Sequence, residues 1–284
     1  MASFDCRPKS VCRIDEGSTN RFLENERAVE DFLKTIEPRY NRALDTMRQG
    51  KPDTDSIYVI AGFIAYVATC SPGAMRIHAD QVAANVHATA LLLDAQGKFD
   101  PPPKSMGVSS LSEALQSGLV AVKIDEKFPQ AIGISVITDL TLLLGNFSWE
   151  LITNTTGSAF LTSDYPVAIE PNETPGIFNR VVPLAPDIAV RLLPRHEARQ
   201  IKGEMKFPLF RHRTINATHG QVRTINLSTV RCAEDSIFSP QLSAWIKPFV
   251  DRNRRFGIVP HSVRHKTNGG YLTVSSMKVE ELRA

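Results

Sequence analysis

The sequence predicts an α+β fold, in which an N-terminal helical bundle packs on a small, mostly antiparallel sheet that two C-terminal helices follow. Up to Leu144, apolar residues recur at the spacing of amphipathic helices. From Trp149 to Leu193, they form short runs divided by Gly, Pro and Asn, a pattern typical of strands. Because helices and strands occupy separate parts of the chain, the pattern favours α+β over an alternating α/β fold.

The first half of the chain begins with two strong helix patterns. From Glu26 to Gln49 the apolar residues lie on one face, and Pro38 should kink or split this helix. Asp53 or Asp55 can cap the next helix. That helix, Ile57 to Thr69, is apolar on nearly all sides, so we expect it at the centre of the bundle.

Three further helices are expected before the strands. One runs from Ala74 to about Asp94, after the break at Ser71-Pro72-Gly73, and another from about Leu111 to Val122. The third, Phe128 to Leu144, could instead form a strand, because four of its residues are β-branched: Ile132, Ile134, Val136 and Ile137.

Five short runs read as strands: Trp149 to Thr153, Ala159 to Thr162, Val167 to Glu170, Arg180 to Pro183, and Ile188 to Leu193. Two helices should follow, the first from about Val222 to Ile237 and the second from Leu242 to Val250, with Ser239-Pro240 as its start. A last strand is expected at Tyr271 to Val274.

The 284 residues are 42% hydrophobic and 22% charged, which is typical of a folded globular chain. We expect an N-terminal extension over residues 1–25 and one α+β domain over 26–250, with its helical half at 26–145 and its sheet and last helices at 146–250. A polar, partly basic tail should occupy 251–284.

Targeting features are few. The four cysteines form no C-x-x-C pair, the N-terminus has no apolar signal core, and the longest apolar run, Ile57 to Cys70, is too short to span a bilayer. These observations predict a cytoplasmic protein that does not insert into a membrane. The formal charge of +3 permits an anionic partner such as nucleic acid.

The stretch from Phe160 to Val167 holds the leading candidate site. Its apolar run ends in Thr162-Ser163-Asp164, where Asp164 could act as a general base or metal ligand at a rigid strand end. The alternative is structural, since Ser and Asp side chains before Pro166 commonly bond to the nearby backbone in a turn. A second strand ending, Val181 to Pro186, follows about twenty residues later.

Charged helical residues supply further candidates. Arg76 could meet an anionic substrate at a helix start, or simply pair with Asp80 four residues later. Glu30 and Glu37, two helical turns apart, could together hold a divalent metal ion, or could be ordinary solvated carboxylates. Later His, Lys and Arg residues could form a nucleic-acid surface or an ordinary solvated basic face.

These residues carry a family resemblance. Phe160 to Val167, followed by Pro183-Leu184-Ala185-Pro186, resembles the paired signature of the bacterial family known as domain of unknown function 4238. The helical layout around Glu30, Glu37 and Arg76 is similar, as are Asn226 in the next-to-last helix and Ser239 after it. The resemblance covers roughly Glu26 to Val250. It lacks the family's N-terminal His-Tyr-Val-Pro-Gln-like segment, and Cys70-Ser71-Pro72 stands where the family has Arg-Thr-Pro.

Two functions are compatible with these candidates. The first is metal-assisted hydrolysis of a phosphate-containing substrate such as nucleic acid, with Asp164, Ser163 and Arg76 as catalytic groups. Thr162, Glu30, Glu37 and Asn226 would then contribute to binding. The second is a non-catalytic binding or interaction module, in which the Thr-Ser-Asp-x-Pro turn is structural.

Overall fold

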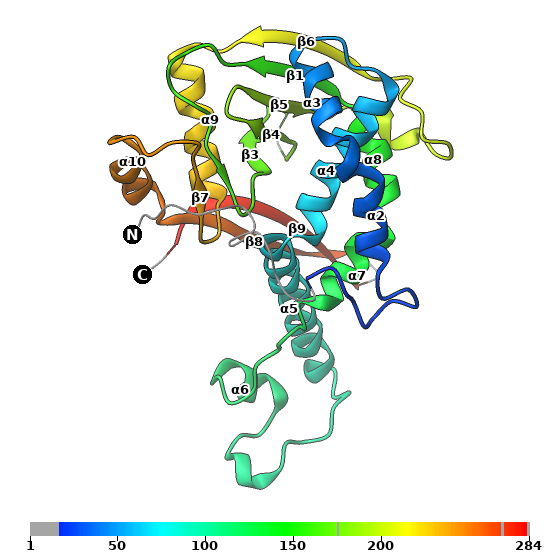
Figure 1. Cartoon of the computed structure of the whole chain (residues 1–284). Helices are drawn as coiled ribbons and strands as arrows, with labels where there is room; N and C mark the ends of the chain where they lie inside the picture. The colour runs from blue at the N-terminus through cyan, green and yellow to red at the C-terminus, as the bar shows by residue number, and fades with distance from the viewer. Residues whose placement is uncertain (1–16, 175, 268–269, 283–284) are drawn as a thin grey trace.

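A five-stranded sheet is the centre of the fold in the computed structural model, which describes residues 17–174, 176–267 and 270–282. Its order is β3-β4-β5-β1-β6. Figure 1 shows the sheet between helix α9 and the group formed by α2, α3, α4 and α8. The predicted α+β class is confirmed, and the antiparallel pairs of the sheet are joined by one parallel pair, β1 with β6.

Pro38 divides the first helical pattern as expected. Helix α2 (Ala28–Ile36) passes through the 3₁₀ turn η1 (Glu37–Arg39) into α3 (Tyr40–Arg48). Helix α4 (Thr54–Cys70) follows and is capped by Asp53, whose side chain accepts a hydrogen bond of 2.7 Å from the Ser56 amide. Helix α4 contacts α2 and α3 as well as the later helices α5, α7 and α8, so its predicted central position is confirmed.

The next helices depart from the predicted boundaries. Helix α5 (Pro72–Ala95) is followed by the 3₁₀ turn η2 (Lys104–Met106) and α6 (Leu111–Gln116). Helix α6 ends before the predicted Val122 because Gly118 adopts a left-handed φ of 76°. The predicted helix from Phe128 to Leu144 is instead two, α7 (Lys127–Ser135) and α8 (Ile137–Gly145), and the strand alternative is wrong.

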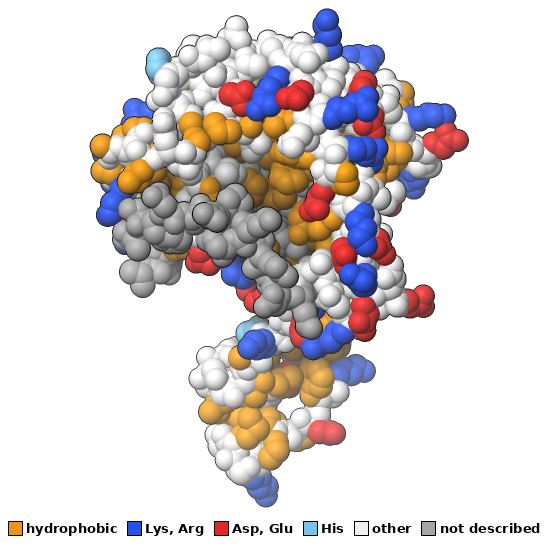
Figure 2. Space-filling view, viewed as in Figure 1, with side chains coloured by type: hydrophobic (Ala, Val, Ile, Leu, Met, Phe, Trp, Pro, Cys, Tyr) orange, Lys and Arg blue, Asp and Glu red, His pale blue; other side chains and the backbone are white. Residues whose placement is uncertain are grey.

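The outer part of α5 projects from the body with α6 beyond it (Figure 1). Figure 2 shows that hydrophobic side chains gather on this projection. Val86, Phe99 and Leu119 are among its exposed apolar residues. No single helix of the described chain is long and apolar enough to cross a membrane. The bent helix pairs α4–α5 and α7–α8 reach that length and apolar character only when the two helices of a pair are counted together.

The predicted strand runs lie in the structure with small shifts. They are β1 (Ser148–Thr153), β2 (Thr162–Ser163), β3 (Ala168–Pro171), β4 (Phe178–Ala185) and β5 (Ile188–Leu193). The predicted run from Ala159 is a strand only from Thr162, where β2 pairs with β7 (Ile237–Phe238). After the 3₁₀ turn η3 (His196–Gln200), strand β6 (Arg211–Asn216) was missed because its residues are polar and basic.

The C-terminal part corrects three expectations. Helix α9 (His219–Cys232) ends before Ile237, which lies in β7, and α10 (Ile246–Asn253) begins well after Ser239. Ser239 does not cap that helix, because its hydroxyl donates to the Gln241 carbonyl within a loop. The expected tail forms a long hairpin of β8 (Phe256–Thr267) and β9 (Gly270–Glu281), which packs against α5 and α9.

A row of charges crosses four strands of the sheet. Glu150 on β1 is only 4% exposed and accepts hydrogen bonds from Arg191 Nη1 at 2.6 Å and from Arg213 Nε at 2.9 Å. Arg191 also donates to Glu170 on β3 at 2.6 Å. Burial raises the pKa of Glu150, but the hydrogen bonds from Arg213 and Arg191 outweigh it, so the pKa lies below its ordinary value of 4.5.

This shift predicts an acid-dependent contribution to stability. A lowered folded-state pKa means that the charged Glu150 stabilises the fold above the ordinary glutamate pKa, and that this contribution is lost as pH falls through the folded value. We expect Glu150→Gln to lower the free energy of unfolding at pH 7 by about 2 kcal/mol, because it weakens two charge-assisted bonds. Denaturant melts from pH 7 down to acid should show the difference from the wild type shrinking. Glu30→Gln, a control at a half-exposed surface ion pair, should change little, and a pH-independent effect of Glu150→Gln would contradict the assignment.

Candidate functional site

Asp164 lies directly after β2 and holds the loop that follows α9. Its Oδ1 accepts a hydrogen bond from the Glu234 amide at 3.0 Å, and its Oδ2 accepts from the amides of Asp235 at 2.7 Å and Ser236 at 3.0 Å. The Asp164 amide donates in return to the Ser236 carbonyl at 3.2 Å. Both carboxylate oxygens are therefore engaged by main-chain donors, as in a capping interaction.

Arg76 reaches the same loop from α5. Its guanidinium binds the Glu234 carboxylate through Nε and through Nη2, the latter at 2.6 Å, and its Nη1 donates to Asp80 at 2.8 Å. The hydrogen bonds to Glu234 raise the pKa of Arg76 above its ordinary value and outweigh the lowering effect of partial burial. Glu234 thus connects Arg76 to Asp164 by its side chain and its amide, and the predicted Arg76–Asp80 pair is present.

Ser163 and Asn226 also bind the backbone. The buried Ser163 hydroxyl accepts a hydrogen bond from the Tyr165 amide at 3.2 Å. The Asn226 side chain, 1% exposed on α9, accepts from the Leu161 amide at 2.8 Å and donates to the Ala159 carbonyl at 3.0 Å. A buried amide bonded in this way holds the segment before β2 against α9.

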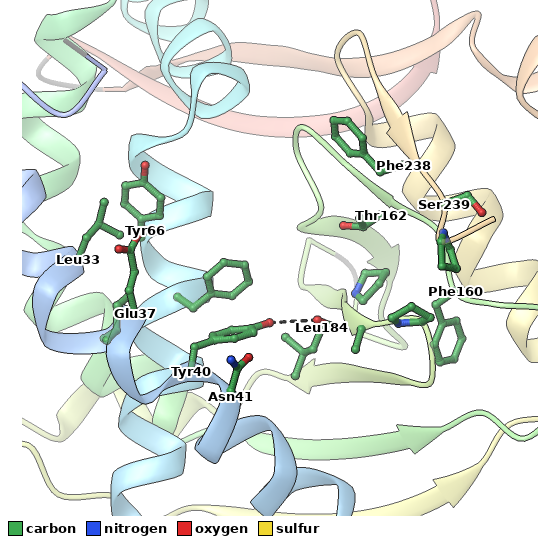
Figure 3. A pocket seen from close by; sticks show the side chains of 16 residues that line it. Leu33, Glu37, Tyr40, Asn41, Tyr66, Phe160, Thr162, Leu184, Phe238 and Ser239 are labelled. Atoms are coloured by element: carbon green, nitrogen blue, oxygen red, sulfur yellow. Dashed lines mark hydrogen bonds between the residues drawn. The ribbon is translucent and has the colours of Figure 1, made fainter. Parts of the chain in front are cut away.

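A cavity of about 860 Å³, here called the central pocket, opens beside this turn between the helical wall and the ends of the strands. Figure 3 shows Glu37 and Tyr66 on the helical wall, with Thr162 and Phe238 on the opposite wall. The pocket is lined by Leu33, Ile36, Glu37, Tyr40, Asn41, Phe63, Tyr66, Phe160, Thr162, Pro183, Leu184, Ala185, Pro186, Phe238, Ser239 and Pro240.

The polar groups of the central pocket are few. The Tyr40 hydroxyl donates to the Leu184 carbonyl at 3.1 Å, shown as a dashed line in Figure 3, and so joins the two walls. The side chains of Glu37, Asn41 and Tyr66 make no hydrogen bond or ion pair with any residue in the described part of the chain. Burial raises the pKa of both Tyr40 and Tyr66 to about 12, so both phenols are neutral at physiological pH.

One carboxylate is the only formally charged group among the residues that line this pocket. That carboxylate belongs to the exposed Glu37, and no Lys, Arg or His contributes to the lining. The rest of the lining is mostly aromatic and aliphatic, with Asn41, Thr162 and Ser239 as uncharged polar residues. Such a pocket suits an apolar molecule with a positive or hydrogen-bond-donating group, because aromatic faces and a carboxylate both attract cations.

The predicted site residues fall into three places. Thr162 and Glu37 line the central pocket, together with the second strand ending, Pro183 to Pro186. Asp164, Ser163 and Arg76 belong to the turn beside it, and Asn226 lies behind the segment that leads to β2. Glu30 does not join Glu37, because it pairs with Arg27 at 2.7 Å and Lys34 at 3.4 Å on the surface of α2.

Several lining residues escaped the sequence reasoning. Tyr40 lies on the apolar face of the amphipathic helix α3, and Phe63 and Tyr66 lie in the strongly apolar α4, where an aromatic side chain is usually part of the core. Phe63 and Tyr66 are three residues apart, which places them on one face of α4. The hydroxyls of Tyr40 and Tyr66 were the only local signal, since a phenol in a buried helix needs a polar partner or a solvated cavity.

The described residues bring no three His, Cys, Asp or Glu side chains within reach of one metal ion. Glu30 forms ion pairs with Arg27 and Lys34 rather than joining Glu37, and the Glu234 carboxylate in the loop beside Asp164 is bonded to Arg76. The site therefore offers backbone clamps and an apolar cavity rather than a gathered set of ligands.

Comparison with known proteins gives one match. The family model described as protein of unknown function (DUF4238) matches residues 2–241. The matched region begins before the expected Glu26 and ends before α10, and it includes both walls of the central pocket. No curated protein and no solved structure matched in the corresponding searches.

The clamp around Asp164 predicts a stability effect. Asp164→Ala leaves the amides of Glu234, Asp235 and Ser236 without their acceptor, so we expect the free energy of unfolding to fall by about 1–2 kcal/mol, as for a lost helix cap. Thermal and urea denaturation measure this change. Asp235→Ala removes a carboxylate from the same loop but none of these acceptors, and should cost less. Equal stabilities of wild type and Asp164→Ala would refute the clamp.

Proposed function

Because the chain belongs to the DUF4238 family of proteins of unknown function, we propose its role from the site itself: it binds a small organic cation with an apolar body in the central pocket. One observation carries the proposal. A cavity of about 860 Å³ is lined mostly by aromatic and aliphatic side chains, and Glu37 supplies the single charged group of the lining. Pockets of about 300–1,000 Å³ are the usual size for small-molecule sites.

The charge of the lining selects the ligand class. An anion entering the pocket would meet the carboxylate of Glu37 and no basic lining residue, so it would lose hydration without gaining a counter-charge. An ammonium group would pair with Glu37 and could also lie against aromatic faces such as those of Tyr66 and Phe63. The open hydrogen-bonding capacity of Asn41 and the Tyr66 hydroxyl would orient polar atoms of the ligand.

The competing proposal is hydrolysis of a phosphate-containing substrate by Asp164 and Arg76. For catalysis, Asp164 would have to break its hydrogen bonds to backbone amides, and Arg76 would have to break its ion pair with Glu234. Both changes would remove bonds that hold the loop after α9 in place. The contacts therefore support binding over hydrolysis, and they support the structural interpretation of the Thr-Ser-Asp-x-Pro turn.

Ligand binding can be tested with a pair of probes that share a ring and differ in charge. We expect phenethylamine, a cation, to bind the protein more tightly than 3-phenylpropionate, an anion, in calorimetric titrations. Glu37→Gln should weaken phenethylamine binding by about tenfold, as loss of a charge-assisted contact does. Glu30→Gln is the matched control, because it removes a carboxylate outside the pocket.

A second variant tests the place of binding. Ala185→Phe adds a ring to a lining residue of β4, so it should obstruct part of the pocket and weaken phenethylamine binding, while the remaining cavity gives the ring room and the melting temperature stays close to that of the wild type. Equal binding of the two probes, or unchanged phenethylamine binding in both Glu37→Gln and Ala185→Phe, would reject the proposal.

The competing proposal has its own measurement. We expect no hydrolysis of bis(4-nitrophenyl) phosphate or of single-stranded and double-stranded DNA when the purified protein is incubated with Mg²⁺ or Mn²⁺. Asp164→Asn, which keeps the size of the side chain, serves as the comparison. Turnover by the wild type that this variant lacks would establish Asp164 as catalytic and overturn the binding-only interpretation.

A further inference from the structure

A second cavity of about 340 Å³ lies on the other side of the segment that leads to β2, where α9 meets α10. We call it the α9–α10 pocket. It is lined by Ser158, His219, Val222, Arg223, Asn226, Trp245, Phe249 and Arg252. It shares no lining residue with the central pocket.

The charge of this cavity is opposite to that of the central pocket. Arg223 and Arg252 line it together with the imidazole of His219, and no Asp or Glu is among the lining residues. Arg223 and His219 form no ion pair or hydrogen bond within the described chain. Arg252 uses only Nε, which donates to the Pro248 carbonyl at 3.1 Å, so both of its terminal nitrogens stay available.

The neighbouring basic residues of α10 behave differently. Lys247 pairs with Asp251 at 2.8 Å, and Arg254 approaches the same carboxylate at 3.8 Å. Of the basic residues from Lys247 to Arg254, only Arg252, which lines the cavity, has no carboxylate partner within the described chain. Guanidinium groups held this way are suited to a phosphate or carboxylate, which they bind through two parallel hydrogen bonds.

Aromatic rings form another part of the lining. Trp245 is 39% exposed and meets Phe249 edge to face, with ring centroids 5.6 Å apart. An exposed indole gives a planar ring of a ligand a surface on which to stack. The buried Val222 adds an apolar contact.

We propose that the α9–α10 pocket binds a small organic anion that carries a planar ring. Its phosphate or carboxylate group meets Arg223 and Arg252, and its ring stacks on Trp245. The volume of about 340 Å³ is near the lower limit for small-molecule pockets, which fits one ring system and one anionic group. This site is independent of the cation site proposed for the central pocket.

The test titrates the full chain with adenosine 5′-monophosphate and with benzoate, the two sources of this chemistry, and follows binding by calorimetry and by tryptophan fluorescence excited at the red edge of the indole band. The chain has two tryptophans, and Trp149 is only 1% exposed, so we expect the fluorescence change to come from Trp245 and to vanish in Trp245→Phe. The tighter of the two probes, here called the preferred probe, is the one used with the variants.

Matched arginine variants locate the site. Arg223→Ala and Arg252→Ala should each weaken the preferred probe by about tenfold or more, since each removes one charge-assisted partner. Arg254→Ala removes the same charge directly after the end of α10, outside the lining, and should leave the affinity within twofold. Glu37→Gln should leave it unchanged, so this test is separate from that of the central pocket. Arginine and tryptophan side chains here are exposed, so these variants should keep the wild-type melting temperature.

Two results would overturn the inference. One is the absence of measurable binding for both probes. The other is an equal loss of affinity in Arg252→Ala and Arg254→Ala, which would mean that the probes respond to the overall positive charge of α10 and not to the pocket.

Discussion

The bond between Asp164 and the loop after α9 is the constraint on which the candidate site depends. One carboxylate accepts hydrogen bonds from three consecutive amides, those of Glu234, Asp235 and Ser236. The chain goes directly from this loop into β7, which pairs with β2 and carries Phe238 into the central pocket. One wall of the pocket is thus positioned by a turn whose Asp164 and Ser163 bond to the backbone, while Thr162 lines the cavity.

Arg76 extends this constraint to the helical half. By binding Glu234, it joins α5 to the same loop, while Tyr40 joins α3 to the end of β4 through the Leu184 carbonyl. The two walls of the central pocket are therefore connected by polar contacts at separate points. This arrangement holds an apolar cavity open, which the hydrophobic effect alone would tend to close.

A single short segment separates two cavities of different chemistry. Phe160 faces the central pocket and Ser158 lines the α9–α10 pocket, while Asn226 bonds to the residues on both sides of Phe160. In the central pocket the carboxylate of Glu37 shares the lining with aromatic rings. In the α9–α10 pocket Arg223 and Arg252 share the lining with aromatic rings. Asn226, predicted from the sequence to contribute to a site, lines the second cavity and supports the wall of the first.

Periodicity and local chemistry by themselves determined the α+β class, the central position of α4, the division of the first helix at Pro38, and β5 to the residue. These features depend on residues that are neighbours in sequence, as in the capping of α4 by Asp53. The polar edge strand β6 escaped this reasoning, because its pairing with β1 is set by a partner about sixty residues away. Distance in sequence also hid the contacts of Asp164, since its three donors lie at residues 234–236, and only the folded chain shows that these amides bond to its carboxylate. The central pocket likewise exists only in the tertiary structure, because its helical and strand walls meet through packing that no local pattern encodes.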